Sequence, residues 1–336
     1  MLIGQEEQER AWVDALASGR MPHAWLLAGP KGVGKAAFAM RAATFLLCDG
    51  DRRAAAGVTS LDIDHADPAA QQIAYGSHPD FIWLKREVPE TKRPKDGSEG
   101  KVEDVARTIN ISQVRAMLAR LRMRPSNSRW RAVVIDSIDD MERSAANALL
   151  KTLEEPPANT IFLLVSHQPG RLLLTIRSRC RMLRFNALGD ATMRQFIKAN
   201  IPAVSDDEAV ALVAIAQGSP GRAALFTDTD LTGIARTLDA IAKTGDRDNA
   251  MRVELARAVV GSGNSRRMEM LLLQANSIAT CRARNSSGNA LLGALVARDH
   301  IADLARDAAS VSADNATIAF AVGNALAALA GECAQR

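Results

Sequence analysis

The segment 131–180 constrains the fold of this chain more than any other. It contains two continuous apolar runs, which end in polar residues at Asp136 and Ser166. Such runs are typical of the buried parallel strands of an α/β sheet. Between them, apolar residues recur at helical spacing over 141–155 until Pro156 ends the predicted helix. The order of strand, acid, helix, strand and polar tip predicts the second half of a nucleoside-triphosphatase core.

A glycine-rich turn lies near the N-terminus, between a predicted strand and a predicted helix. Its glycines Gly29, Gly32 and Gly34 precede Lys35 in the sequence GPKGVGK, which fits the GxxxxGK spacing of a phosphate-binding loop. Glycines allow backbone N–H groups to face a phosphate, and the lysine adds positive charge. The next position normally carries a hydroxyl that binds Mg²⁺, but here it is Ala36. The loop therefore predicts a degenerate site, and the sequence leaves open whether ATP or ADP binds there.

Three segments together resemble the clamp-loader branch of the AAA+ family, and within it the delta-prime subunits of bacterial DNA polymerase III. They are NALLKTLEEPP, the strand that ends at Ser166, and TIRSRC. The resemblance covers roughly residues 2–222. It implies an α/β plus all-α fold, in which a P-loop-type parallel-sheet domain is followed by a helical lid and a helical collar. We expect these parts over residues 1–186, 187–226 and 227–336.

Within that resemblance, the chain lacks two groups of an active site. Asp136 matches the Mg²⁺-binding acid of the Walker B motif, but the next residue, normally a glutamate that activates water, is Ser137. Asp139 and Asp140 follow too late to replace it, because a shift along strand and loop moves a side chain by several ångströms. Phosphoryl transfer depends almost entirely on positioning and electrostatics. The loss of both the metal-binding hydroxyl and the base therefore predicts very weak ATPase activity or none.

Three further residues have roles that the same resemblance implies. Ser166 matches the sensor 1 position, which contacts the gamma phosphate, and Arg222 matches the sensor 2 position or else packs the lid against the core. Arg179, in the motif Ser-Arg-Cys, resembles the arginine finger that one clamp-loader subunit inserts into its neighbour's ATP site. A guanidinium delivered in trans neutralises charge that develops on the transferred phosphate. The alternative is a surface arginine paired with a local acid.

The resemblance implies a subunit of the clamp loader, which uses ATP held by its motor subunits to open a ring-shaped sliding clamp and place it on primed DNA. We expect a stator in a pentameric hetero-oligomer with gamma/tau and delta subunits, within a DNA-directed DNA polymerase holoenzyme. One alternative is a gamma/tau-type ATPase motor, against which Ala36 and Ser137 speak. Others are an AAA+ DNA-binding or helicase-loading factor, which would need a DNA-reading module after the lid, and a P-loop kinase, which would need no collar.

Metal binding is a separate question, because related ATPase modules often carry a four-cysteine zinc site. The four cysteines here form no CxxC pair, and only Cys48 lies where a first ligand would stand. Replacement ligands would have to come from Asp62, Asp64, His65 and His78. Scattered acids and histidines in a polar loop are usually only solvated, so we expect no zinc and no other metal.

A predicted helix over 109–125, with Ser112 as its cap, carries a cluster of arginines on its outward face. The cluster includes Arg115, Arg120, Arg122 and Arg124, with Arg129 and Arg131 beyond the helix. Such a cluster suits contact with the phosphates of primed DNA. The alternative is a solvated face, which the lack of interleaved aromatic residues favours.

Composition sets broader limits. The chain has 336 residues and a net charge of +4, which is too small to imply a nucleic-acid partner by itself. The sequence contains no run of about 18 strongly apolar residues, so we expect no membrane span and a cytoplasmic protein. The charged segment 87–104 has the composition of a surface loop.

Everything after residue 227 is predicted to be helical, and apolar stripes indicate the buried faces. One stripe comprises Leu231, Ile234, Leu238 and Ile241; another comprises Leu291, Leu292, Leu295 and Val296; a third comprises Ile318, Val322, Ala325 and Leu329. Clusters of Gly and Asn at 261–264 and 285–289 mark turns. No constellation of residues in this region points to chemistry.

Overall fold

The structure, a computed structural model, describes residues 3–49, 56–58, 60–64, 66–87, 106, 108–201, 204, 206–225, 231–260, 264–310 and 314–331. The chain divides into two compact units, Met1–Leu188 and Gly189–Arg336. The first unit ends close to the expected boundary at residue 186. The further division of the second part into lid and collar stays a prediction.

The first unit is built on a five-stranded sheet in the order β2-β3-β4-β1-β5. The strands are β1 (Ala24–Ala28), β2 (Phe81–Lys85), β3 (Arg131–Asp136), β4 (Thr160–Ser166) and β5 (Arg181–Arg184). Every pair is parallel, so all the carboxyl ends lie at one edge. The register pairs Asp136 with Val165 and Ala28 with Ser166. Polar strand tips from distant parts of the sequence therefore meet at that edge.

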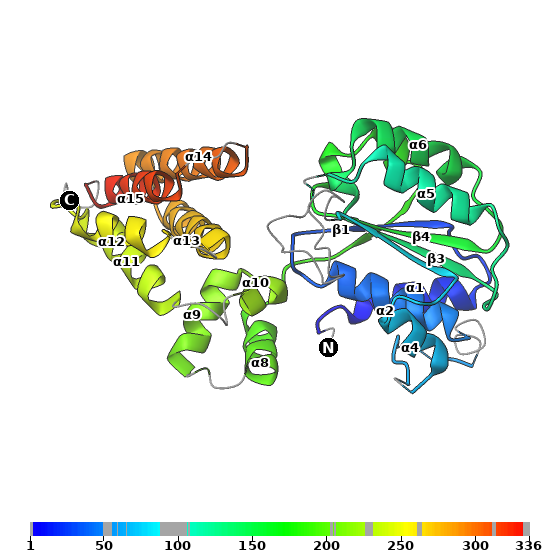
Figure 1. Cartoon of the computed structure of the whole chain (residues 1–336). Helices are drawn as coiled ribbons and strands as arrows, with labels where there is room; N and C mark the ends of the chain where they lie inside the picture. Colours follow the sequence, from blue (N-terminus) through cyan, green and yellow to red (C-terminus); the bar gives the residue numbers. More distant parts are fainter. Residues whose placement is uncertain are drawn as a thin grey trace, which may run out of the picture. The chain divides into compact units, whose positions relative to one another are not determined.

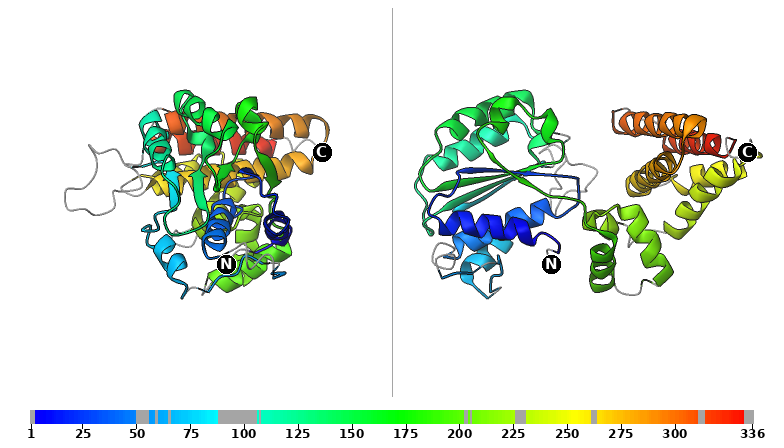
Figure 2. Two further views of the ribbon diagram at one scale, coloured as in Figure 1. Left: turned by 90° about the vertical axis from the view of Figure 1, so that its right-hand side faces the viewer. Right: turned by 180° about the vertical axis from the view of Figure 1, so that it is seen from behind.

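Helices cover both faces of this sheet (Figures 1 and 2). On one face lie α1 (Glu6–Ala17), α2 (Lys35–Leu47) and α4 (Pro68–Ala74), and on the other lie α5 (Ile111–Leu121) and α6 (Arg143–Glu154). A short helix, α7 (Leu174–Arg177), connects β4 to β5. Helices on both faces explain why the inner strands β1, β3 and β4 are almost entirely buried, whereas the edge strand β5 is partly exposed.

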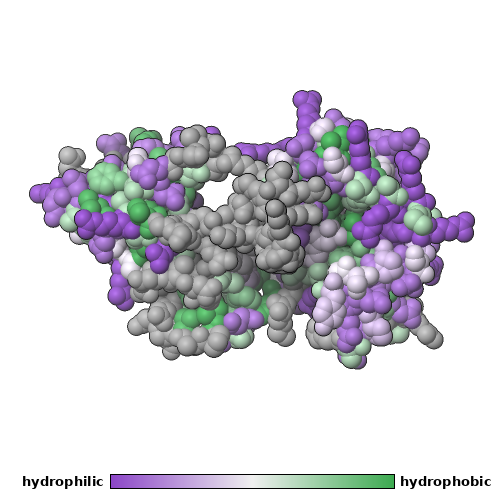
Figure 3. Space-filling view, viewed as in Figure 1, coloured by the Kyte–Doolittle hydropathy of each residue, from purple (hydrophilic) through white to green (hydrophobic). Residues whose placement is uncertain are grey.

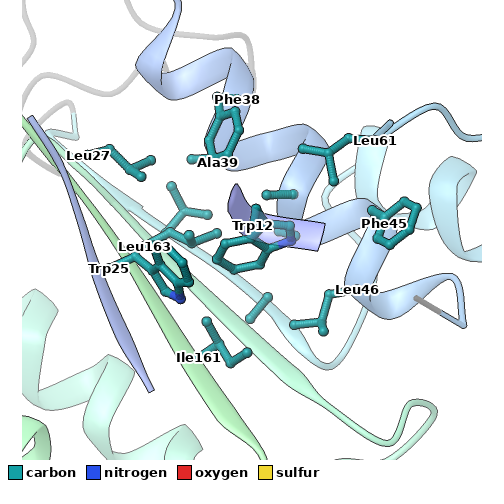
Figure 4. Packing of buried hydrophobic residues seen from close by; sticks show 14 of the residues in the cluster. Trp12, Trp25, Leu27, Phe38, Ala39, Phe45, Leu46, Leu61, Ile161 and Leu163 are labelled. Atoms are coloured by element: carbon teal, nitrogen blue, oxygen red, sulfur yellow. The ribbon is translucent and has the colours of Figure 1, made fainter. Parts of the chain in front are cut away.

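Alternate residues of each strand enter the two hydrophobic cores. Trp25 and Leu27 of β1 pack toward α1 and α2, whereas Leu26 packs toward α5 and α6. Figure 4 shows the first core, in which the rings of Trp12 and Trp25 lie with their centroids 5.0 Å apart beside Phe38. Burial of the apolar side chains in both cores supplies the main hydrophobic drive to fold this unit.

The second unit is entirely helical among the residues described. Its helices are α8 (Asp190–Asn200), α9 (Asp206–Ala216), α10 (Pro220–Leu225), α11 (Leu231–Thr244), α12 (Ala250–Ala258), α13 (Asn264–Arg284), α14 (Gly288–Ser310) and α15 (Asn315–Gly331). The five helices α11, α12, α13, α14 and α15 share one hydrophobic core. The expected fold class, α/β followed by all-α, is confirmed. In the described part of the chain, no helix is both long and apolar enough to cross a membrane.

Several local predictions are confirmed and others are wrong. Ile318, Val322, Ala325 and Leu329 are all buried, as are Ile234, Leu238 and Ile241; the side chain of Leu231 lies outside the described residues. The stripe on α14 is wrong, because Leu292 and Val296 are 62% and 69% exposed while Ala294, Ala297 and Ile301 are buried. Close packing between α13, α14 and α15 selects small side chains.

The predicted cap of α5 is also wrong. Asn110, not Ser112, accepts the N–H of Gln113, whose side chain in turn accepts the N–H of Asn110. This reciprocal pair is a capping box, which satisfies two backbone donors at once. The connection between α2 and β2, which gave no helix signal, contains α4, capped by Asp67. Apart from Glu87, the charged segment 87–104 lies outside the described residues.

Candidate functional site

The carboxyl edge of the sheet brings together the glycine loop, Asp136 and Ser166. The loop follows β1, Asp136 ends β3, and Ser166 ends β4. The backbone N–H of Gly29 donates to the carbonyl oxygen of Ser166 at 3.2 Å. Residues predicted from separate motifs thus lie around one site, because parallel strands present their carboxyl ends together.

Two features of the glycine loop require glycine. A Cβ at Gly29 would lie 2.1 Å from the carbonyl oxygen of Phe185, which leaves no room for any side chain. Gly32 and Gly34 have φ values of 81° and 102°, a region that favours glycine. Gly34 also forms the N-cap of α2, so the loop leads directly into a helix N-terminus.

Lys35, the first residue of α2, is buried against its own loop. Its ammonium donates to the carbonyl oxygen of Gly29 at 2.6 Å and also to that of Pro30. Burial lowers the pKa of Lys35 to about 8, although the charges of Asp139 and Asp136 partly oppose the shift. Two of the three N–H donors of the ammonium that a phosphate would attract are therefore already engaged by the backbone of the chain.

The position of a Mg²⁺ ion is poorly supported by the residues present. Ala36 offers a methyl group where a hydroxyl is needed. Burial raises the pKa of Asp136, and the charge of Asp140 raises it further. The charges of Lys35 and of the basic residues at the end of β2 oppose this shift only in part. Ser137 is buried, and its hydroxyl lies 3.4 Å from the carboxylate of Asp139. This donor set does not fit a catalytic metal.

Asp139, which the sequence indicated only as an acid too far along the chain to replace the water-activating glutamate, connects two parts of this edge. One carboxylate oxygen accepts the hydroxyl of Ser166 at 3.0 Å and the N–H of Gln168 at 3.2 Å. The other accepts the N–H of His167 at 2.5 Å. Asp139 thus joins the loop after β3 to the tip of β4, and it accepts the hydrogen bond of the Ser166 hydroxyl. The sequence shows an acid after Asp136 but not which backbone it meets.

His167 is a residue of this edge that the sequence did not indicate. Burial and the nearby charge of Lys35 lower its pKa. Nδ1 of His167 is buried and has no hydrogen-bond partner among the described residues. A neutral imidazole therefore lies beside the glycine loop.

Arg179 follows α7 and makes three contacts. Its Nη1 donates to the carbonyl oxygen of Thr175 at 2.8 Å and lies 3.3 Å from the hydroxyl of Ser178. Its Nη2 lies 2.6 Å from a carboxylate oxygen of Glu154, the last residue of α6. The side chain remains 31% exposed. A local acid does pair with this arginine, as the alternative reading expected, and the guanidinium still reaches solvent.

The contacts of Arg222 lie within the second unit. Its Nη1 donates to the side-chain oxygen of Gln217 at 3.3 Å. Burial lowers the pKa of Arg222, and the charge of Glu269 on α13 opposes the shift. A role for Arg222 at the nucleotide stays a prediction.

The arginines proposed to contact DNA are exposed on and after α5. This group comprises Arg115, Arg120, Arg122 and Arg124. In Figure 3 the surface over α5 and α6 is largely hydrophilic. Arg131 does not belong with them, because it is buried, donates to the carbonyl oxygens of Arg120 and Met123, and pairs with the buried Asp80. Arg131 is therefore structural.

The residues considered as zinc ligands have other contacts. Cys48 donates to Asp67 at 3.3 Å, Asp62 pairs with Arg41, and His78 accepts the N–H of Asp80. His65 lies outside the described residues. Among the residues that the structure describes, no group of three or more His, Cys, Asp or Glu side chains is arranged to hold a metal.

Comparisons with known proteins identify the family. A family model described as "DNA polymerase III, delta subunit" matches residues 4–189, more than half of the chain. The chain is 34% identical to the DNA polymerase III subunit delta' of Pseudomonas aeruginosa, over 63% of this chain and 58% of that protein. It is 29% identical to subunit tau of Salmonella typhimurium, over 80% of this chain and 39% of tau.

The matched regions span less than two thirds of these relatives. Among solved structures, a gamma subunit-related protein from Thermotoga maritima aligns over 95% of this chain and 98% of its own, with 13% identity and a TM-score of 0.46. The family match and the delta' relative agree with the arrangement of the first unit. The chain belongs to the family described as DNA polymerase III, delta subunit.

Proposed function

We propose that this protein is the delta-prime subunit of a DNA polymerase III clamp loader. It acts as a stator in a cytoplasmic pentameric complex with gamma/tau and delta subunits, which loads the sliding clamp on primed DNA. It supplies Arg179 in trans to a neighbouring ATPase subunit and hydrolyses little or no ATP itself.

One observation carries this proposal: the groups needed for hydrolysis in cis are missing or already engaged. Ala36 and Ser137 replace the metal-binding hydroxyl and the water-activating acid. Lys35 donates to the carbonyl oxygens of its own loop, and the hydroxyl of Ser166 donates to Asp139. A site whose predicted phosphate-binding groups form hydrogen bonds within the chain suits a rigid subunit better than a motor. Phosphoryl transfer needs those groups free and directed at the nucleotide.

The segment around Arg179 supports the proposed action in trans. Its guanidinium is partly exposed, and Leu174, at the start of α7, is 74% exposed. Arginine is enriched at protein contact surfaces relative to the rest of the protein surface. An arginine finger contributes about 10³–10⁵ to the rate of a nucleotide hydrolase, so its delivery by a neighbour couples hydrolysis to assembly.

The second candidate is a gamma/tau-type motor. The match to tau, which extends over 80% of this chain, favours it. This candidate requires brisk ATP turnover by the chain itself, whereas the stator requires turnover only in its partners.

The deciding experiment is a steady-state ATPase assay stimulated by clamp and primed DNA. The gamma/tau and delta subunits are assayed alone, with this protein, and with its Arg179→Ala variant. We expect the wild type to raise turnover, and the variant to assemble normally while losing most of that stimulation. Equal stimulation by the variant would refute the finger. Rapid ATP hydrolysis by the isolated protein would refute the stator role and support the motor role.

A further inference from the structure

We propose that Glu154 is a positioning residue for Arg179: its carboxylate fixes the direction in which the guanidinium is presented to a neighbouring subunit. This inference rests on the proposed function, because it concerns the same arginine. Among the described residues Glu154 forms its ion pair with Arg179 and none with the glycine loop or a predicted nucleotide group, so it would act through Arg179.

The contacts of Arg179 define a fixed orientation. Nη1 is held by the carbonyl oxygen of Thr175 at 2.8 Å, and Nη2 by the carboxylate of Glu154 at 2.6 Å. Two contacts on different nitrogens of a planar group fix both its position and the plane in which it lies. The side of the guanidinium that stays exposed is then the side available to an incoming phosphate.

Both residues that hold the guanidinium are carried by anchored elements. Glu154 immediately follows Leu153, whose side chain is fully buried against the sheet. Thr175 precedes Ile176, which is 1% exposed and belongs to the same core. Cys180, which follows Arg179 in the sequence, is also removed from water, because burial raises the pKa of its thiol to about 12. The guanidinium of this flexible side chain is thus bound to Thr175 and Glu154, which the core keeps in place.

Such a tie does little for folding stability. The Glu154 side chain is 49% exposed, and exposed ion pairs contribute little because water and salt screen them. Its value is geometric, since a catalytic group displaced by about 1 Å loses much of its effect.

The neighbouring residue provides a matched control. Glu155 has the same side chain and is exposed, and in the described part of the chain its carboxylate makes no ion pair with Arg179. Glu154→Gln and Glu155→Gln remove the same charge one residue apart. Any effect of net charge or of α6 stability should be similar in the two variants.

The test uses the reconstituted complex with clamp and primed DNA. We expect Glu154→Gln to lower kcat for ATP about three- to tenfold with unchanged KM, Glu154→Asp to restore part of the loss, and Glu155→Gln to match wild type. Adding Glu154→Gln to Arg179→Ala should lower kcat no further. Gel filtration should show equal assembly of all variants.

Other results would overturn the inference. If Glu154→Gln turns over ATP as fast as wild type while Arg179→Ala fails, the finger stands and the positioning role does not. If Glu154→Gln is faster than wild type, Glu154 restrains the finger instead. A further loss in the Arg179→Ala background, or impaired assembly, would mean that Glu154 acts by another route. If Arg179→Ala itself has no effect, the proposed function has failed.

Discussion

At the scale of single residues, Lys35 determines how nucleotide binding would depend on pH. The free protein holds this ammonium in a buried position with a pKa of about 8. A bound phosphate favours the charged form and raises that pKa, so binding above pH 8 requires uptake of a proton. Affinity for ADP should therefore fall as pH rises through 8.

We expect ADP to bind about tenfold more weakly at pH 9 than at pH 7, because only about a tenth of Lys35 stays charged one pH unit above its pKa. Titration calorimetry at the two pH values measures this. Lys35→Arg should show a flat profile, since a guanidinium does not titrate in this range. The same slope in both proteins would place the titrating group elsewhere.

Asp139 joins the tips of two strands, and we expect its loss to destabilise the first unit. Asp139→Asn removes a charged acceptor from the N–H groups of His167 and Gln168, which should lower the free energy of unfolding by about 1–3 kcal/mol. Denaturation by urea measures the change. Asp140→Asn is the control: among the described residues the carboxylate of Asp140 pairs with the half-exposed Arg86, so the cost should stay below about 1 kcal/mol. Equal costs would contradict the bridging role.

Asp139 also shows where prediction from the sequence ends. The phosphate-loop glycines, Asp136 and Ser166 follow from spacing, because each ends or follows a strand in a parallel sheet. The partners of Asp139 depend on how far two loops approach each other, and no pattern in the sequence encodes that distance. Lys35 and Glu154 are similar cases, since the sequence gives the residues but not the carbonyl oxygens or the guanidinium that they meet.

At the scale of secondary-structure elements, α14 shows why apolar periodicity can indicate the wrong face. Leucine and valine mark one side of this helix, but alanines lie in the core, where neighbouring helices leave little space. On α15, by contrast, the apolar stripe and the buried face coincide. Periodicity identified both helices, and only the packing distance decided which side of α14 is buried.

Two substitutions on α14 test this assignment. Ala294→Leu adds volume to a fully buried position and should cost about 1–3 kcal/mol of stability. Leu292→Ala, on the exposed side of the same helix, should change stability by less than about 0.5 kcal/mol. Thermal denaturation of the isolated chain compares them. If Leu292→Ala proved the more costly, the face predicted by periodicity would be the buried one.

The arginines on α5 make a prediction about DNA. If Arg115 and Arg122 contact phosphates, replacing each with Gln should weaken DNA binding by the complex and reduce the slope of log K against log salt by about 0.9 per contact. Fluorescence anisotropy of labelled primed DNA at several salt concentrations measures this slope. Arg194→Gln, at an exposed position of α8, should leave the slope unchanged. An unchanged slope in all variants would favour the solvated face.

At the scale of the whole molecule, the two units differ in how much of their function the sequence indicates. The first unit has motifs at fixed spacing, and a family model matches it almost from end to end. The second unit has helices without chemical motifs, so its sequence indicates a class of structure but no partner. The chemistry of the protein is therefore predicted from the first unit, whereas a role of the second unit in assembly is implied only by the resemblance to clamp-loader subunits.

This division leads to a test with the first unit alone. Residues 1–188 contain the sheet and two hydrophobic cores, one on each face, so we expect this fragment to fold and to unfold in one cooperative transition. It retains both Arg179 and Glu154.

If the helical unit joins the subunits, this fragment should nevertheless fail to stimulate ATP turnover at concentrations where the full chain saturates, since an arginine finger that is not docked cannot reach a neighbour's phosphate. Adding the fragment in large excess should restore part of the stimulation, and the same fragment with Arg179→Ala should restore none. Full stimulation by the fragment at the concentration of the intact chain would mean that the first unit carries the assembly contacts as well as the arginine.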